Sequence, residues 1–143
     1  ADECVNYADE DLRERLKVLG GKAGIDVIYD AVGGHWAEPA FRSLGWRGRY
    51  LVIGFAAGDI PKLPLNLALL LERDIVGVYW GAWTRHCPDE FAQATAELAR
   101  WFADGRLRPH VSATYPLERS AQALADLASR RAKGKIVVVM PPS

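Results

Sequence analysis

Two short apolar runs constrain the fold of this chain more than any other feature. Residues 26–34 read DVIYDAVGG and residues 48–55 read GRYLVIGF, each with glycine near its carboxyl end. Both runs are rich in β-branched and aromatic residues and too short for an ordinary helix, so they are predicted to be strands. Neither run alternates with polar residues, and a helical stretch at 36–44 separates them, which is typical of parallel strands buried on both faces. The sequence therefore predicts an α/β fold.

Ligands of open α/β sheets bind in the loops at the carboxyl ends of parallel strands. The first places to look for chemistry are therefore the loops after the two runs. They contain Val32, Gly33 and Gly34 in one case and Gly54, Phe55 and Ala56 in the other.

Composition excludes several classes of function. The chain has 143 residues, about one domain, and 18 basic residues balance 18 acidic ones. This balance gives no electrostatic case for nucleic acid or a membrane surface. The apolar runs are too short to span a membrane, and the acidic start at Asp2 and Glu3 does not resemble a signal peptide. We expect a segment from the middle of a longer protein.

Cysteine usage favours a reducing, cytoplasmic setting. Cys4 and Cys87 lie far apart and have no metal-ligand spacing, and a single disulfide between them is the alternative. His35, His86 and His110 are equally scattered, so we expect no metal site.

Periodicity and turn residues predict the remaining elements. The predicted strands are 4–7, 26–32, 49–53, 74–80, 110–115 and 135–140, and the predicted helices are 9–19, 36–44, 65–71, 88–105 and 117–129. Asp9 is the expected cap of the first helix, and Pro88 suits a first helical position. Trp36, Ala40, Phe41 and Leu44 form a stripe that should face the core. The pattern changes near 106–109, where we place a domain boundary.

Several landmarks follow one another in a familiar order. They are ADECVNY (1–7), DEDLRERL (9–16), the two strand runs, YPLE (115–118), AQAL (121–124) and SRRAKGKIVVV (129–139). Together they resemble the C-terminal half of a zinc-independent NADPH:quinone oxidoreductase of the medium-chain dehydrogenase/reductase superfamily. The resemblance covers essentially the whole chain.

The resemblance implies a partial Rossmann fold, doubly wound with a mainly parallel sheet, that lacks its first strands and its glycine-rich phosphate loop. Residues 1–109 would be the second part of the dinucleotide-binding domain. Residues 110–143 would be the C-terminal segment of the catalytic, GroES-like domain, returning as strand, helix and strand. The GGKAG motif at 20–24 precedes a strand instead of following one, so it does not match the phosphate loop.

The resemblance also implies an NADPH site. Its cofactor-binding residues would be Tyr7 at the adenosine-phosphate end, Val32 and Gly33 at the nicotinamide ribose, Ile53, Gly54 and Phe55 near the nicotinamide, and Arg130 and Lys135 on the phosphate side. Without the resemblance, the glycines read as turn formers, Phe55 as a core aromatic, Tyr7 as a strand residue and Arg130 as part of a solvated basic turn. The residues alone leave these alternatives open.

Three further residues have structural interpretations. Asp30 is expected to cap the turn that follows its strand instead of acting as an acid or base. Trp80 and Trp83 follow a predicted strand. We expect their side chains to pack in the core or in an interface, in preference to lining a substrate pocket.

The favoured function is hydride transfer from NADPH to a quinone or another α,β-unsaturated carbonyl compound, without zinc or a protein nucleophile. The alternatives are an enoyl reductase or alcohol dehydrogenase of the same superfamily, or a non-catalytic, self-associating fragment. The chain by itself is expected to be inactive. The strand at 74–80 contains no proline or lysine and should lie at the edge of the sheet, where an unpaired strand invites pairing. We therefore expect a homodimer through residues 74–80, as the resemblance also implies.

Overall fold

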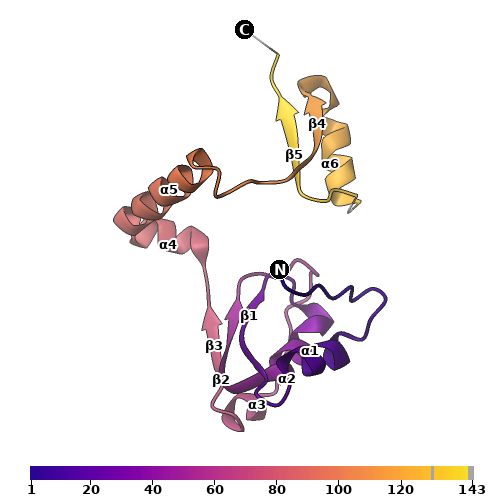
Figure 1. The fold of residues 1–143 in the computed structure, drawn as a ribbon, viewed down its shortest axis with the longest axis vertical. Helices are drawn as coiled ribbons and strands as arrows, with labels where there is room; N and C mark the ends of the chain where they lie inside the picture. The colour runs from indigo at the N-terminus through magenta and orange to yellow at the C-terminus, as the bar shows by residue number, and fades with distance from the viewer. Residues whose placement is uncertain (130, 142–143) are drawn as a thin grey trace. The chain divides into compact units, whose positions relative to one another are not determined.

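The computed structural model describes residues 1–129 and 131–141 (Figure 1). The chain divides between residues 83 and 84 into two compact units. Each unit contains its own parallel sheet with helices beside it, so the predicted α/β class is confirmed. The predicted domain boundary at residue 109 concerns the whole protein and stays a prediction.

One or two helical elements separate each strand from the next. The first unit contains α1 (Leu12–Gly20), β1 (Ile25–Asp30), the 3-10 helix η1 (Gly34–Trp36), α2 (Ala37–Ser43), β2 (Leu44–Val52), α3 (Asn66–Leu69) and β3 (Asp74–Gly77). Helix α4 (Trp80–His86) contains the division between the units. The second unit contains α5 (Pro88–Ala103), β4 (Val111–Pro116), η2 (Leu117–Arg119), α6 (Ser120–Ala128) and β5 (Lys135–Val139).

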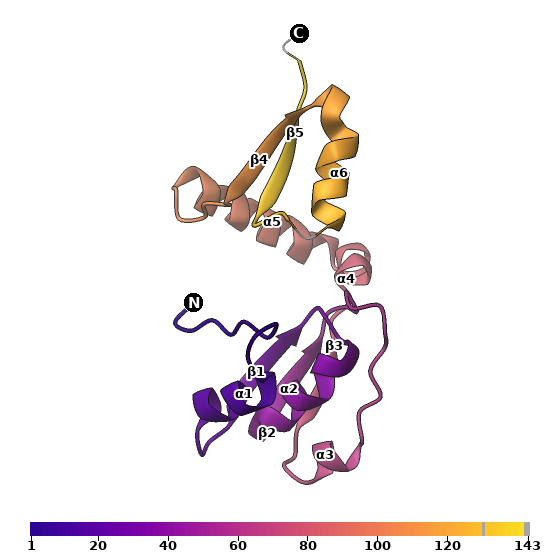
Figure 2. The ribbon, with the colours of Figure 1, turned by 90° about the vertical axis from the view of Figure 1, so that its right-hand side faces the viewer.

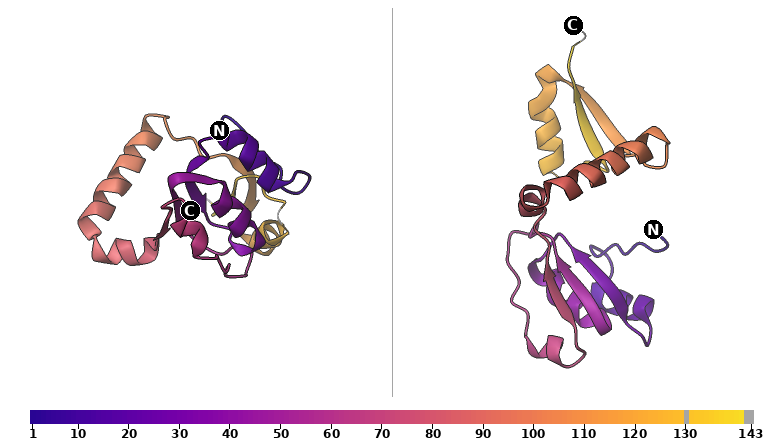
Figure 3. Two further views of the ribbon diagram at one scale, coloured as in Figure 1. Left: turned by 90° about the horizontal axis from the view of Figure 1, so that it is seen from below. Right: turned by 90° about the vertical axis from the view of Figure 1, so that its left-hand side faces the viewer.

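The sheet of the first unit has the order β1-β2-β3, and both strand pairs are parallel. Asp30 at the end of β1 lies opposite Val52 at the end of β2, so the two carboxyl ends are level. Helices α1 and α2 lie on one side of this sheet (Figure 2 and Figure 3). On the strands, Val27 is 40% and Tyr29 70% exposed. The expectation that both faces are buried is therefore wrong for the described residues, because the helices cover one face.

A small core lies between α2, α3 and the sheet. It consists of Ala37, Phe41, Leu44, Tyr50 and Leu67. Phe41 and Tyr50 meet edge to face, with ring centroids 5.5 Å apart and planes at 84°. Burying a large apolar side chain contributes about 1.5–3 kcal/mol. Of the stripe predicted on a helix at 36–44, Phe41 is buried on α2 and Ala40 is half-buried there, whereas Leu44 is buried as the first residue of β2.

The second unit repeats the strand, helix and strand order in a two-stranded sheet. Strands β4 and β5 are parallel, with Thr114 opposite Val137, and α6 lies beside them (Figure 3). Ala123 on α6 is 4% exposed. The predicted C-terminal return is therefore confirmed.

Two expectations at the start of the chain need correction. Residues 4–7 form no strand, because Asn6 folds the backbone into a turn in which its carbonyl accepts the amides of Asp9 and Glu10 at 3.0 and 2.9 Å. The cap of α1 is Asp11, whose Oδ1 accepts the Glu14 amide at 3.0 Å. Asp9 lies in the preceding turn.

Two further elements are shorter than predicted. The buried helix expected at 65–71 is the four-residue α3, which buries Leu67 and leaves Leu65 and Leu69 76% and 79% exposed. The strand expected at 74–80 ends at Gly77, although the Val78 amide still donates to the Val52 carbonyl at 3.0 Å. Trp80, 57% exposed, starts α4 and does not belong to the core of the described residues.

Candidate cofactor-binding site

The loops after β1 and β2 lie side by side because the strands are adjacent and parallel. Backbone hydrogen bonds join them at three points. The amides of Ala56 and Ala57 donate to the carbonyls of Ala31 and Val32 at 3.1 and 2.9 Å. The amide of Gly34 donates to the carbonyl of Asp59 at 3.1 Å. The two predicted loops therefore form one continuous surface at the carboxyl edge of the sheet.

Asp30 holds both loops. Its Oδ1 accepts the amides of Val32 and Gly33 at 2.8 and 2.9 Å. Its backbone carbonyl accepts the amides of Ile53 and Gly54 at 2.9 and 3.3 Å. The backbone amides of four predicted cofactor-binding residues thus all donate to this one aspartate. The geometry matches the capping role expected for Asp30.

The second carboxylate oxygen of Asp30 accepts a hydrogen bond from the Tyr50 hydroxyl. Tyr50 is 1% exposed and belongs to the core. Burial raises the pKa of the Tyr50 hydroxyl well above its usual value, and the hydrogen bond and charge of Asp30 raise it further. Tyr50 is therefore a neutral donor throughout the physiological pH range.

The glycines of the two loops differ in what the fold requires of them. Gly33 has φ +67°, and a Cβ there would lie 2.9 Å from Cδ1 of Phe55. Gly54 lacks such a φ, and its Cβ would meet only the Ala31 carbonyl oxygen at an ordinary 3.5 Å. Glycine is thus needed at 33 by the loop itself. No contact within the described residues needs glycine at 54.

Two aromatic side chains border this edge. Phe55 packs over Gly33 and is 39% exposed, so it is not the core aromatic of the alternative interpretation. Tyr7 is 48% exposed and lies with its ring 4.9 Å from that of Trp36, in the 3-10 helix that follows Gly33. Tyr7 is thus placed near the Gly33 loop by the first unit itself.

The remaining predicted residues belong to the second unit. Lys135 is exposed at the start of β5, and its amide donates to the His110 carbonyl at 2.8 Å. Arg130 lies outside the described residues. Its neighbour Ser129 donates through its hydroxyl to the Asp126 carbonyl at 3.1 Å, and the Arg131 amide donates to the same oxygen at 3.1 Å. Both neighbours are therefore tied to the end of α6.

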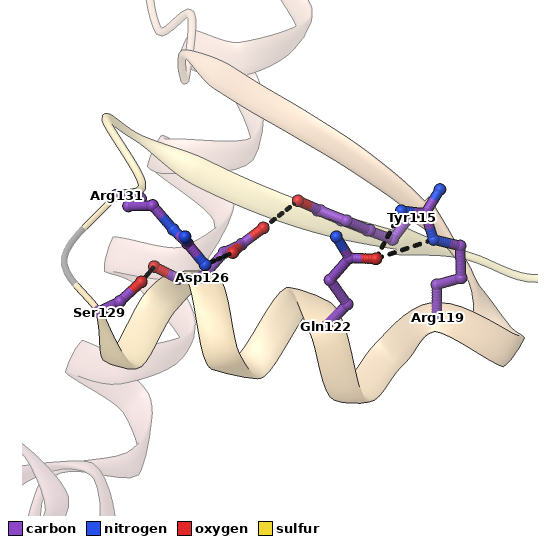
Figure 4. Close-up of polar contacts among 6 residues, drawn as sticks. All are labelled: Tyr115, Arg119, Gln122, Asp126, Ser129 and Arg131. Carbon is purple, nitrogen blue, oxygen red and sulfur yellow. Dashed lines mark hydrogen bonds and ion pairs between the residues drawn. The ribbon is translucent and has the colours of Figure 1, made fainter.

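Asp126 organises that end of α6, as Figure 4 shows. Its carboxylate accepts the Tyr115 hydroxyl from β4 at 2.5 Å and the guanidinium of Arg131. The hydrogen bond from Tyr115 lowers the pKa of Asp126, and Arg131 lowers it further. The same bond raises the pKa of Tyr115. Arg119 lies over the Tyr115 ring, 5.7 Å from its centroid, and its Nε donates to Gln122 at 3.0 Å.

Sequence reasoning missed both tyrosine–aspartate pairs. The DAVGG motif does indicate the capping role of Asp30, because the amides that it accepts lie two and three residues further along the chain. The tyrosine partners are not visible, because Tyr50 and Tyr115 lie 20 and 11 residues from their aspartates along the chain.

Two hollows in the first unit differ in how they relate to the carboxyl edge of the sheet. A hollow of about 1020 Å³ is lined by residues that include Gly20, Gly24 and Arg73 and contains none of the predicted cofactor-binding residues. A hollow of about 460 Å³ borders Gly34 and Asp59. The GGKAG motif ends α1 and leads into β1, so its predicted mismatch with a phosphate loop is confirmed.

Metal, disulfide and membrane features are also defined for the described part of the chain. No group of three or more His, Cys, Asp or Glu side chains there is arranged to hold a metal ion. Cys4 and Cys87 are both free. Within residues 1–129 and 131–141, no helix combines the length and apolar character that crossing a membrane requires.

Comparison with known proteins identifies the family. Residues 1–138 match the family described as zinc-binding dehydrogenase. Quinone oxidoreductase-like protein 2 of Mus musculus is 34% identical over 138 residues, which cover 96% of this chain and 39% of that protein. Quinone oxidoreductase of Lama guanicoe is 31% identical over 141 residues, covering 98% of this chain and 41% of that protein.

A solved structure agrees with these relatives. Escherichia coli quinone oxidoreductase complexed with NADPH has a TM-score of 0.80 and 27% identity, covering 96% of this chain and 42% of that one. The chain thus spans about two fifths of the length of these proteins. It belongs to the zinc-binding dehydrogenase family, as a C-terminal part of the kind found in quinone oxidoreductases of the medium-chain dehydrogenase/reductase superfamily.

Proposed function

We propose that the protein containing this chain transfers hydride from NADPH to a quinone or a similar α,β-unsaturated carbonyl compound. The names of its relatives and the NADPH complex of the Escherichia coli enzyme support this proposal. NADPH supplies the hydride when bound, and the protein binds, orients and shields it from water. The residues of this chain would form one wall of that site.

The observation that carries the proposal is the glycine at position 54. Gly54 lies at the carboxyl edge of the parallel sheet, where α/β folds bind ligands. The described residues leave ordinary space for a Cβ at this position. A requirement for glycine there would therefore come from a group outside the chain, such as a cofactor ring lying against the backbone.

The chemistry of the edge favours the uncharged part of the cofactor. Asp30 consumes the amides of Val32, Gly33, Ile53 and Gly54, so none of these four can bind a phosphate. The Asp30 carboxylate would also repel an anion. Phe55, 39% exposed, offers an apolar face instead. This edge fits the nicotinamide and its ribose.

The phosphate side requires cations from elsewhere. The family resemblance assigns this role to Arg130 and Lys135, and the exposure of Lys135 leaves its ammonium accessible. An arginine guanidinium suits a phosphate because it donates two parallel hydrogen bonds. Tyr7 would complete the adenosine end. We further propose that the enzyme acts in the cytoplasm without zinc.

We also propose a homodimer through β3. This strand is at the end of the order β1-β2-β3, and Ile75 and Val76 are 43% and 39% exposed. An exposed apolar edge strand can pair with its own copy across a two-fold axis.

The test uses the full-length protein, with NADPH and NADH compared as hydride donors to quinones and to enones. We expect NADPH oxidation that depends on the acceptor. Arg130→Ala should raise the KM for NADPH more than that for NADH, because a hydrogen bond to a charged group is worth about 1.5–3 kcal/mol. Lys133→Ala is the matched control, since it removes an exposed charge from the same basic run. Absence of acceptor-dependent oxidation would contradict the proposed reaction, and equal losses with both donors would contradict the role of Arg130.

A further inference from the structure

The loop that contains Val32 and Gly33 depends on a side chain for its shape. Its two amides donate to Oδ1 of Asp30, which makes the carboxylate the centre of the turn. Gly33 adopts φ +67° there and packs under Phe55. Displacement of the Asp30 carboxylate would therefore release the turn and the aromatic ring above it.

Tyr50 fixes the orientation of that carboxylate. With Oδ1 occupied by the two amides, Oδ2 is the oxygen that accepts the Tyr50 hydroxyl. Tyr50 itself is held in the core, 1% exposed and edge-on to Phe41 at 5.5 Å between centroids. The Tyr50 hydroxyl and the Asp30 carboxylate thus connect the core to the loop by hydrogen bonds.

We infer that Tyr50 and Asp30 form a positioning pair, in which the buried tyrosine orients the aspartate and the aspartate holds the cofactor-binding loops in place. This inference rests on the proposed function for its effect on NADPH. Neither side chain needs to touch the cofactor. Tyr50 acts through Asp30, and Asp30 acts through the amides of Val32, Gly33, Ile53 and Gly54.

The first test is Tyr50→Phe in the full-length protein, which removes the hydroxyl and keeps the ring. We expect exchange of the Val32 and Gly33 amides with deuterium to accelerate about 3- to 10-fold, the range of one net hydrogen bond. The Kd for NADPH should rise by a similar factor, with kcat nearly unchanged. Tyr29→Phe is the matched control, because its ring is 70% exposed on β1 and neither readout should change.

A second control distinguishes a general loss of protein stability from a loss of the Asp30 side chain's position. Leu67→Ala removes a side chain that is 6% exposed in the same core and makes no bond to Asp30. It should destabilise the protein without the selective exchange at Val32 and Gly33. An equal rise in Kd and exchange in this variant would overturn the inference.

Substitution of the aspartate gives an independent test. Asp30→Asn retains an oxygen that can accept both amides, whereas Asp30→Ala retains none, so Asn should preserve NADPH affinity better than Ala. Equal affinities in the two variants, or wild-type exchange in Tyr50→Phe, would refute the positioning role. If the wild-type protein binds no NADPH, the proposed function fails, and the exchange rates alone decide whether the pair holds the loop.

Discussion

The two glycines of the candidate site allow a sharp prediction, because the fold explains one and not the other. Gly33→Ala should destabilise the first unit. Gly33 has φ +67° and ψ −143°, close to a region that essentially only glycine adopts, and holding an L-residue there costs of order 1–3 kcal/mol. The added Cβ would also lie 2.9 Å from Cδ1 of Phe55, so the ring must shift. We expect a loss of about 2 kcal/mol in the free energy of unfolding.

Gly54→Ala should behave in the opposite way. The position lacks a left-handed φ, and the Cβ would have an ordinary 3.5 Å contact. Replacing glycine where the backbone permits it stabilises by about 0.4–1 kcal/mol, since the unfolded chain loses freedom. In the full-length protein, however, the methyl group should lower the affinity for NADPH at least tenfold, roughly 1.4 kcal/mol.

The assay combines urea unfolding of the chain with NADPH titration of the full-length protein for both variants. A stability difference in the predicted direction would show that the loop geometry is correct. Wild-type NADPH affinity in Gly54→Ala would refute the argument that a cofactor lies against this backbone. A loss of stability in Gly54→Ala would refute the claim that the fold leaves room there.

Three further predictions address the fragment, its assembly and its pH dependence. Calorimetric titration should show weak or no binding of NADPH to the chain alone, because its amides at the sheet edge are consumed and it contains no matching phosphate loop; a micromolar Kd would contradict this. Val76→Pro should shift the full-length protein from dimer towards monomer or aggregate in sedimentation, because proline removes a donor and misfits the strand; a monomeric wild type would exclude the dimer. The raised pKa of Tyr50 predicts that its stabilising contribution is complete below about pH 10, the ordinary tyrosine pKa, and declines as the pH rises further. Alkaline unfolding should therefore be less steep for Tyr50→Phe, and identical pH curves would contradict the assignment.

Local patterns were sufficient to predict the parallel pair β1 and β2 and the place where their loops meet. The two runs are apolar, short and separated by a helical stretch, and each of these properties acts over a few residues. The buried side of α2 was predictable for the same reason, because Phe41 lies on the predicted helical stripe, but the strand that begins at Leu44 was not. Parallel pairing then brings Gly33 and Phe55 together without further information.

Patterns of composition failed where a tertiary partner decides the structure. The leucine-rich run at 65–71 was expected to be buried, but Leu67 is its one buried residue in the described core, with Ala68 partly buried against it. The segment at 4–7 was expected to be a strand, but Asn6 satisfies its backbone groups locally. Apolar or β-forming residues predict burial and pairing only when a second surface is present to receive them.

The hydrogen bonds of Asp30 explain why Gly33 and Gly54 cannot by themselves provide the phosphate-binding part of a dinucleotide site. A phosphate-binding loop presents free amides to an anion, often at the start of a helix. Here the amides of Val32, Gly33, Ile53 and Gly54 all point to one aspartate, which a buried tyrosine orients in turn. The loops gain a fixed shape and lose the capacity to bind phosphate. A fixed and partly aromatic wall would suit the flat nicotinamide ring that we propose for this edge, and the charged half of NADPH would then be bound by other residues of the full protein.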